Sequence, residues 1–165
     1  MAETGNQDSH TIAGQQPART WTLTGELGAS AFLNARSFAL EQIVKPNLSF
    51  AATTPLTHHL SWGARVSGIL SGTGGYQAAG LAGVIRWAPL GHNSDWDPGV
   101  SLALGVGINA DILHEDLDAD GFIAPFGSLA LSSYWSVIDQ WRLGVVARYT
   151  QLSVAELSLG VSYSP

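Results

Sequence analysis

The strongest constraint on the fold of this chain is an alternation of apolar and polar residues that continues from residue 20 almost to the C-terminus. In Val100–Ile112 every even-numbered residue is apolar, and the odd-numbered residues are Ser, Ala, Gly, Asn or Asp. A helix mixes these two sets on its surface, whereas the pleat of a β-strand places them on opposite faces. The segment is also longer than the usual strand of about five or six residues. We therefore expect an all-β protein built from long strands.

The same alternation recurs in eight segments, which predicts eight strands. Turn-like stretches separate them at Asn34–Arg36, Thr53–Thr57, Ser71–Gly75, Ala88–Pro98, Leu113–Gly121, Ile138–Asp139 and Gln151–Ser153. Pro46 lies inside the second segment, and because proline removes a ladder donor, we expect a bulge or a strand end near it. A helix over Phe38–Val44 is the alternative for this part of the chain.

The composition of the polar face indicates which side of the barrel is inside. A soluble barrel points its apolar face inward, whereas a membrane barrel turns that face to lipid and fills its lumen with the polar one. Here the polar face is mostly Gly, Ala, Ser and Thr, and only 12% of the chain is charged, against about a quarter in ordinary proteins. Small residues suit the narrow interior of an eight-stranded barrel. We therefore predict a transmembrane β-barrel with up-and-down antiparallel topology.

The charged residues of the strands support the same arrangement. Four acids and five bases fall on the polar face: Glu26, Glu41, Lys45, Arg65, Arg86, Asp111, Arg142, Arg148 and Glu156. Because buried charges need partners, we expect a network of ion pairs in the lumen. Ion pairs on the surface of a soluble barrel are the alternative interpretation.

Tryptophan and tyrosine residues fall on the apolar face by parity. Most of them are expected near strand ends, where membrane barrels carry interfacial aromatic girdles; they are Trp21, Trp62, Trp87, Trp135, Trp141, Tyr149 and Tyr163. Trp62 is expected to be more central than the others. The pattern indicates an apolar band bordered by aromatic side chains.

With this strand number, parity and girdle, residues 20–164 resemble the small eight-stranded outer-membrane barrels of Gram-negative bacteria, the OmpA-like and OmpX-like group. The last segment, Ala155–Tyr163, is similar to the alternating, aromatic-ended C-terminal strand of those proteins, although Ser164 and Pro165 follow it. The resemblance implies a bacterial outer-membrane location and contact with membrane lipid and lipopolysaccharide. Residues 19–165 would form the single barrel domain, after a flexible polar tail at residues 1–18.

The N-terminal sequence and the composition restrict the possible cellular location and the possible ligands of the protein. The N-terminus lacks a basic start followed by an apolar run, so we expect either a mature form without its signal peptide or a cytosolic protein. No apolar run is long enough for a transmembrane helix. The chain has no cysteine for disulfides or thiolate metal sites. Its net charge of −6 is unfavourable for nucleic-acid binding.

Two short motifs are candidates for catalysis. His59 and Ser61 lie on one face of a predicted strand, and outer-membrane lipid A deacylases are similar in using a His-x-Ser pair on a barrel strand. A working nucleophile also needs an orienting group, and no residue can be assigned to that role. The segment His92–Asp97 could hold a metal or an acid–base pair, but its residue types are more typical of turns.

An acidic segment is the candidate metal site. Asp116, Asp118, Asp120 and Gly121 match the start of a calcium loop, and Glu115 could add a further oxygen. Gly127 stands where an EF-hand has its bidentate Glu, so we expect at most an isolated calcium loop. A solvated acidic turn is the alternative.

Taken together, these patterns favour a non-enzymatic outer-membrane barrel that is structural or presents loops to a protein, lipid or surface polymer. They leave two alternatives open. One is a lipid-modifying hydrolase of the deacylase type that uses His59 and Ser61, and the other is a lipocalin-like soluble barrel around a small apolar ligand. No cofactor is expected other than calcium at the acidic segment.

Overall fold

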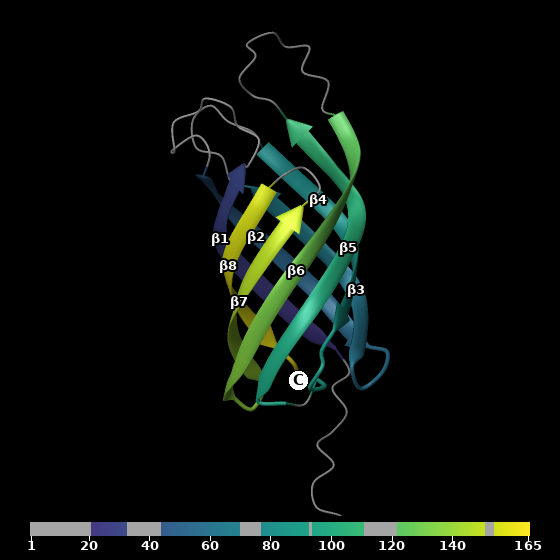
Figure 1. Cartoon of the computed structure of the whole chain (residues 1–165), viewed down its shortest axis with the longest axis vertical. Helices are drawn as coiled ribbons and strands as arrows, with labels where there is room; N and C mark the ends of the chain where they lie inside the picture. Colours follow the sequence, from purple (N-terminus) through teal and green to yellow (C-terminus); the bar gives the residue numbers. More distant parts are fainter. Residues whose placement is uncertain (1–20, 33–43, 70–76, 93, 111–121, 151–153) are drawn as a thin grey trace, which may run out of the picture.

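The computed structural model describes residues 21–32, 44–69, 77–92, 94–110, 122–150 and 154–165. These residues form one closed barrel of eight strands, each antiparallel to the next, with β1 paired to β8 (Figure 1). The strands are β1 (Thr22–Phe32), β2 (Val44–Pro55), β3 (Leu60–Ile69), β4 (Gln77–Trp87), β5 (Trp96–Ala110), β6 (Phe122–Ile138), β7 (Trp141–Thr150) and β8 (Val154–Tyr163). The predicted eight-stranded, all-antiparallel barrel is therefore confirmed. Among the described residues we find no helix that is long and apolar enough to cross a membrane.

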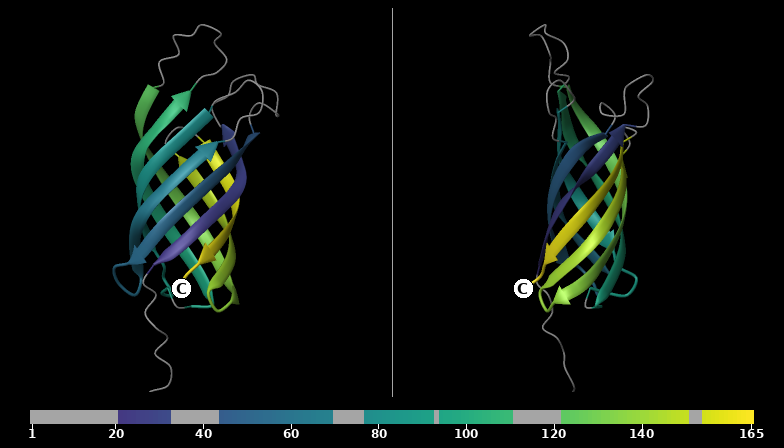
Figure 2. Two further views of the ribbon diagram at one scale, coloured as in Figure 1. Left: turned by 180° about the vertical axis from the view of Figure 1, so that it is seen from behind. Right: turned by 90° about the vertical axis from the view of Figure 1, so that its left-hand side faces the viewer.

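The two ends of the barrel differ in their connections. Trp21 and Tyr163 lie at one end, which we call the terminal end, and the turns at 56–59, 88–95 and 139–140 join strands there. The opposite end, called here the loop end, is where the chain leaves β1, β3, β5 and β7 (Figure 2). Residues 1–20, 33–43, 70–76, 93, 111–121 and 151–153 lie outside the described part of the chain. The flexible tail at residues 1–18 and most of the alternative helix Phe38–Val44 fall there.

Among the described residues, Pro46, Pro98 and Pro125 each pair with one neighbouring strand. Pro46 pairs with β1, and the described part of the ladder to β3 begins at Asn47. Pro98 pairs with β6 before the ladder to β4 begins at Val100, and Pro125 pairs with β5, whereas the described part of the ladder to β7 begins at Ser128. A proline has no N–H to donate, so pairing on one side accommodates it at little cost. Pro46 is the third residue of β2 as described, near the expected strand end, whereas the turn expected to extend to Pro98 ends earlier, and β5 starts at Trp96.

The outer and inner faces have the polarity expected of a barrel in lipid. Large apolar side chains point outward along every strand, with exposed fractions of 66% for Leu104 and 71% for Leu159. The inward side chains include buried serines and the buried ionised residues Glu26, Arg65 and Arg148. A soluble barrel that encloses an apolar ligand has the opposite arrangement. The polar lumen expected from the parity is therefore present.

All six tryptophans of the chain lie at the terminal end, near the start or end of a strand. Trp62 is the third residue of β3, so its expected central position is wrong. Trp96 begins β5 and lies opposite Trp135 on β6, whereas the sequence placed it in a turn. Tyr163 joins this group through contacts with Trp21 and Trp141, at ring-centroid distances of 5.9 and 4.8 Å. These residues form a girdle, defined here as Trp21, Trp62, Trp87, Trp96, Trp135, Trp141 and Tyr163, each exposed or half-buried.

One lumen aromatic is packed over glycines of the neighbouring strands. Tyr134 of β6 is 6% exposed and lies over Gly144 of β7 and Gly160 of β8, which are themselves paired. A Cβ atom added to Gly160 would lie 2.6 Å from the Tyr134 hydroxyl oxygen and 2.9 Å from Cε1. The absence of a side chain at residue 160 is therefore what allows the tyrosine ring to lie flat across the inner wall.

Gly160→Ala is expected to reduce the free energy of unfolding by about 1–3 kcal/mol, because overpacking of a filled interior forces neighbours out of position. The same change in a Tyr134→Leu background should cost much less, since the ring is no longer in the way. Chemical unfolding in detergent micelles, measured for both single variants and the double variant, gives the coupling between the two positions. Equal costs in the two backgrounds would contradict this packing.

Candidate functional site

The lumen contains two ion-paired clusters, and the first contains one base between two acids. Arg148 of β7 donates from Nη1 to Glu156 Oε2 at 2.7 Å, and from Nη2 to Glu26 Oε2. Arg148 and Glu156 are direct cross-strand partners, so the register brings them together. Ser49 of β2 donates to the same Glu26 oxygen at 2.8 Å. This cluster, named here the acid–base–acid cluster, ties β1, β2, β7 and β8 across the lumen.

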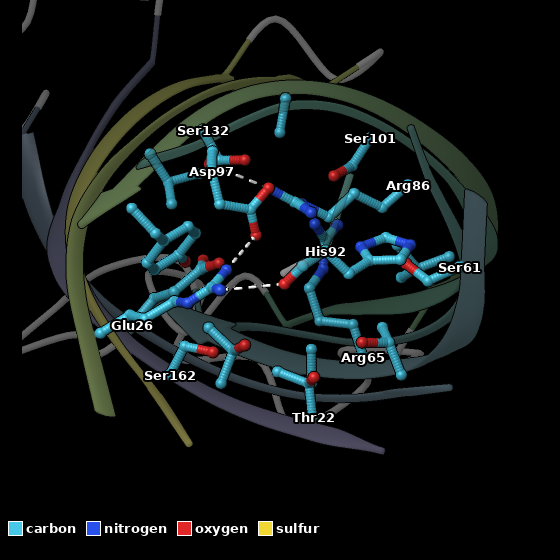
Figure 3. Close-up of a pocket in the computed structure, with 18 of the residues that line it drawn as sticks. Thr22, Glu26, Ser61, Arg65, Arg86, His92, Asp97, Ser101, Ser132 and Ser162 are labelled. Carbon is cyan, nitrogen blue, oxygen red and sulfur yellow. Dashed lines mark hydrogen bonds and ion pairs between the residues drawn. The ribbon is translucent and has the colours of Figure 1, made fainter. Parts of the chain in front are cut away.

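The second cluster has the opposite composition and lies nearer the terminal end. Asp97 of β5 accepts from Arg86 Nη2 on β4 at 2.8 Å through Oδ1, and from Arg142 Nη1 on β7 at 2.7 Å through Oδ2. Its side chain is only 9% exposed. Figure 3 shows it among the side chains that line the lumen cavity. We call this arrangement the base–acid–base cluster. Together the two clusters link β1, β2, β4, β5, β7 and β8 through the lumen.

Asp97 is the functional residue that the sequence analysis missed. The sequence prediction placed it in a turn because the residue types of His92–Asp97 are typical of turns, whereas the structure places it inside the lumen. Its parity was the available signal, since Asp97, Ser101 and Ala103 are odd-numbered and all face inward on β5. The turn interpretation of His92–Asp97 therefore holds only up to Asp95.

Between the two clusters lies a cavity of about 80 Å³. Its wall contains side chains of both clusters, several Ser and Thr hydroxyls, and Arg65 of β3 (Figure 3). Arg65 crosses the lumen and donates from Nη2 to Ser128 Oγ on β6 at 2.8 Å. The chamber is thus polar and small, with room for only a few water-sized groups.

A neutral hydrogen-bonded group of side chains adjoins the acid–base–acid cluster. Asn47 Nδ2 donates to Ser30 Oγ at 2.7 Å, and Ser158 Oγ donates to Asn47 Oδ1 at 3.0 Å. All three side chains are buried. Lys45, which the sequence assigned to the lumen network, is half-buried two residues away on β2. The other two expected members, Glu41 and Asp111, lie outside the described residues.

The structure does not form a catalytic pair from His59 and Ser61. His59 lies in the turn before β3, is exposed, and its Nδ1 is 3.0 Å from the carbonyl oxygen of Ala88. Ser61 is 5% exposed and faces the lumen cavity. No hydrogen bond joins the two side chains among the described residues. The candidate calcium residues Asp116, Asp118 and Asp120 lie outside the described part of the chain.

Hydrogen bonds hold the β4–β5 turn against the terminal end of the lumen. Arg142 Nη2 donates to the carbonyl oxygens of His92 and Ser94, both at 2.9 Å. The backbone N–H of His92 donates to the carbonyl of His58 in the neighbouring turn at 3.2 Å. The His92 side chain lines the cavity (Figure 3). This turn therefore closes the chamber from the terminal end.

The pKa of His92 predicts how acid affects this closure. Burial lowers the pKa below its ordinary value, with Arg86 and His58 adding to the effect and a hydrogen bond to the Leu60 backbone and the charge of Asp97 opposing it. As the pH falls, the unfolded chain therefore binds a proton at this residue before the folded chain does, and the folded state loses stability below about pH 6.5. His92→Asn should weaken that loss, whereas His58→Asn, which changes an exposed ring, should retain it. Melting temperatures measured by thermal unfolding from about pH 8 to about pH 5 show the difference. The same pH dependence of the melting temperature in His92→Asn and in the unaltered protein would contradict this role of His92.

Comparison with known proteins shows the fold. No family model matches the chain. No curated protein matches it either. Neisserial surface protein A superposes with a TM-score of 0.66 at 10% identity, covering 88% of this chain and 96% of that one. The N-terminal β-barrel domain of Pseudomonas aeruginosa OprF gives 0.59 at 11% identity, with 89% and 98% covered.

A third similar structure contains a ligand. Ail, the attachment invasion locus protein of Yersinia pestis, in complex with the heparin analogue sucrose octasulfate, has a TM-score of 0.51 at 12% identity and covers 88% of this chain and 99% of that one. The chain therefore has the fold of the small eight-stranded outer-membrane barrels, as the sequence resemblance implied.

Proposed function

We propose that this protein is a non-enzymatic integral barrel of the bacterial outer membrane, which holds the segments at its loop end outside the cell. The observation that supports it best is the inverted polarity: large apolar side chains are exposed all around the barrel, while ionised residues are buried in the lumen. A band of this size is unfavourable in water and favourable in hydrocarbon. The fold shared with outer-membrane barrels agrees with this proposal.

The lumen supports a structural rather than a transport role. The two ion-paired clusters, the neutral group around Asn47 and the contacts of Arg142 with the β4–β5 turn fill much of the described interior. The interior of an eight-stranded barrel is just wide enough for its own side chains or one small ligand. The protein would therefore act through its outer surface and its loop end, not by passing solutes.

The charge of the loop-end segments favours a cationic or cation-bridged partner. Residues 111–121 contain five acids and neither Lys nor Arg. Such a segment repels sulfated polymers of the kind bound to Ail. Lipopolysaccharide bridged by divalent cations is the partner we propose, and calcium binding at Asp116, Asp118 and Asp120 stays a prediction.

Refolding tests the membrane assignment. The denatured protein should refold as β-sheet in uncharged detergent and in lipid vesicles, and the folded form should migrate differently from the heated form on a denaturing gel. The reason is that only detergent or lipid removes the apolar side chains of the outer face from water. A folded monomer in plain aqueous buffer would contradict the proposal.

Fluorescence quenching tests the position of the girdle. Because all six tryptophans lie at the terminal end, lipids brominated close to the headgroup should quench the emission more strongly than lipids brominated at the chain ends. Leu104→Trp places an added fluorophore in the middle of β5 and should introduce quenching by the deep bromines. Equal quenching at both depths in the unaltered protein would contradict a girdle at one interface.

A further inference from the structure

The described lumen has more positive than negative charge. Three carboxylates, Glu26, Asp97 and Glu156, face four guanidinium groups in the same interior. Each carboxylate is ion-paired with Arg86, Arg142 or Arg148. The acid–base–acid cluster thus carries one net negative charge and the base–acid–base cluster one net positive charge. Arg65 adds a further positive charge, has no ion pair among the described residues, and is only 4% exposed.

Arg65 has hydrogen-bonding capacity that the described residues do not use. Its Nη2 donates to Ser128 Oγ, but its buried Nε has no hydrogen-bond partner among the described residues. No described carboxylate lies within ion-pair distance of it. A buried cation that is neither paired nor fully hydrogen-bonded is costly. An ion or ordered water in the chamber beside Arg65 is therefore expected to offset that free-energy cost.

The chamber has the size and donors for a small anion. Its volume is about 80 Å³, which accommodates one small ion with water or a few waters alone. Besides Arg65, its wall offers hydroxyl donors such as Ser61, Thr53 and Ser101. A divalent anion would exceed the single unbalanced charge of the described lumen residues.

We propose that the chamber binds a small monovalent inorganic anion of the chloride class beside the guanidinium of Arg65. The anion enters when the barrel closes and serves as the missing counter-ion of the lumen. It would thus be a structural ligand, independent of whatever the loop end binds. Water alone would satisfy the Nε donor but would leave the charge unbalanced.

Stability in different salts tests the proposal. The full chain is refolded in uncharged detergent, and thermal unfolding is followed while chloride replaces fluoride at constant ionic strength. Binding to the folded state alone raises the melting temperature with chloride until the site saturates. Lys45→Gln, which removes a half-buried cation from the same barrel, should keep this dependence, and Arg65→Gln should lose it. Dependence that persists in Arg65→Gln, or its absence from the unaltered protein, would overturn the proposal.

Crystals grown with bromide give a second measurement that does not need the variant. Bromide replaces chloride and scatters anomalously, so a peak in the chamber beside the Arg65 guanidinium is expected. If Arg65→Gln does not refold, this peak decides the question. A chamber that contains only water density in the presence of bromide would refute the anion site while leaving the membrane proposal intact, because that proposal rests on the outer surface.

Discussion

Replacing Arg148 by methionine is expected to lower the free energy of unfolding by about 3–5 kcal/mol, the range found when a buried ion pair loses one partner. Arg148 is the one base of the acid–base–acid cluster, so both Glu26 and Glu156 lose their described ion pair at once. The three side chains are between 4% and 10% exposed, which prevents water from replacing the guanidinium. Equilibrium unfolding in lipid vesicles, followed by tryptophan emission, measures the loss.

A second substitution separates charge from packing. Adding Glu156→Gln to Arg148→Met removes one of the two stranded charges and should recover part of the lost stability. A loss of less than about 1 kcal/mol for Arg148→Met, which is typical of exposed ion pairs, would show that the cluster is hydrated rather than buried.

Leu104→Arg is expected to cost about 2–4 kcal/mol, because it places a charge near the middle of the apolar band. Leu104 lies centrally in β5 and its side chain is 66% exposed on the outer face. Ile138 has the same exposed fraction but ends β6 at the terminal end. Ile138→Arg is therefore the matched control, with an expected cost of about 0–1 kcal/mol near the interface.

Vesicle refolding titrations give both values. The difference between the two sites is the informative quantity, because both variants add the same side chain to an equally exposed position. Equal costs at the two depths, or a harmless Leu104→Arg, would mean that the outer face does not lie in hydrocarbon.

The sequence predicts the strands and their faces because alternation of apolar and polar residues with a period of two indicates a β-strand. Each inward residue on β7, such as Arg142 and Arg148, follows from parity alone. The pairing of these residues does not follow from it. Whether Arg148 meets Glu156 or Asp97 depends on the stagger between strands, which one-strand patterns do not contain. Asp97 was assigned to a turn because the Asn- and Ser-containing segment before it is typical of turns, and residue types alone do not show that β5 already begins at Trp96.

The position of Trp62 shows a different limit. The sequence correctly predicted that Trp62 faces outward but wrongly predicted a central position along its strand. Trp62 lies at the edge of the apolar band because β3 begins at Leu60, only two residues earlier. Turn residues define such boundaries only to within a few positions. The chamber beside Arg65 could not have been predicted at all, since it is a space left between side chains of strands that are distant in sequence.

Pro125 bears on how the β5–β6 hairpin behaves among other chains. From Phe122 to Gly127, β6 pairs with β5, and its pairing with β7 begins at Ser128 among the described residues. A proline offers no amide hydrogen to an incoming strand and interrupts its ladder. Pro125 therefore makes this stretch of β6 a poorer template for β-augmentation and aggregation.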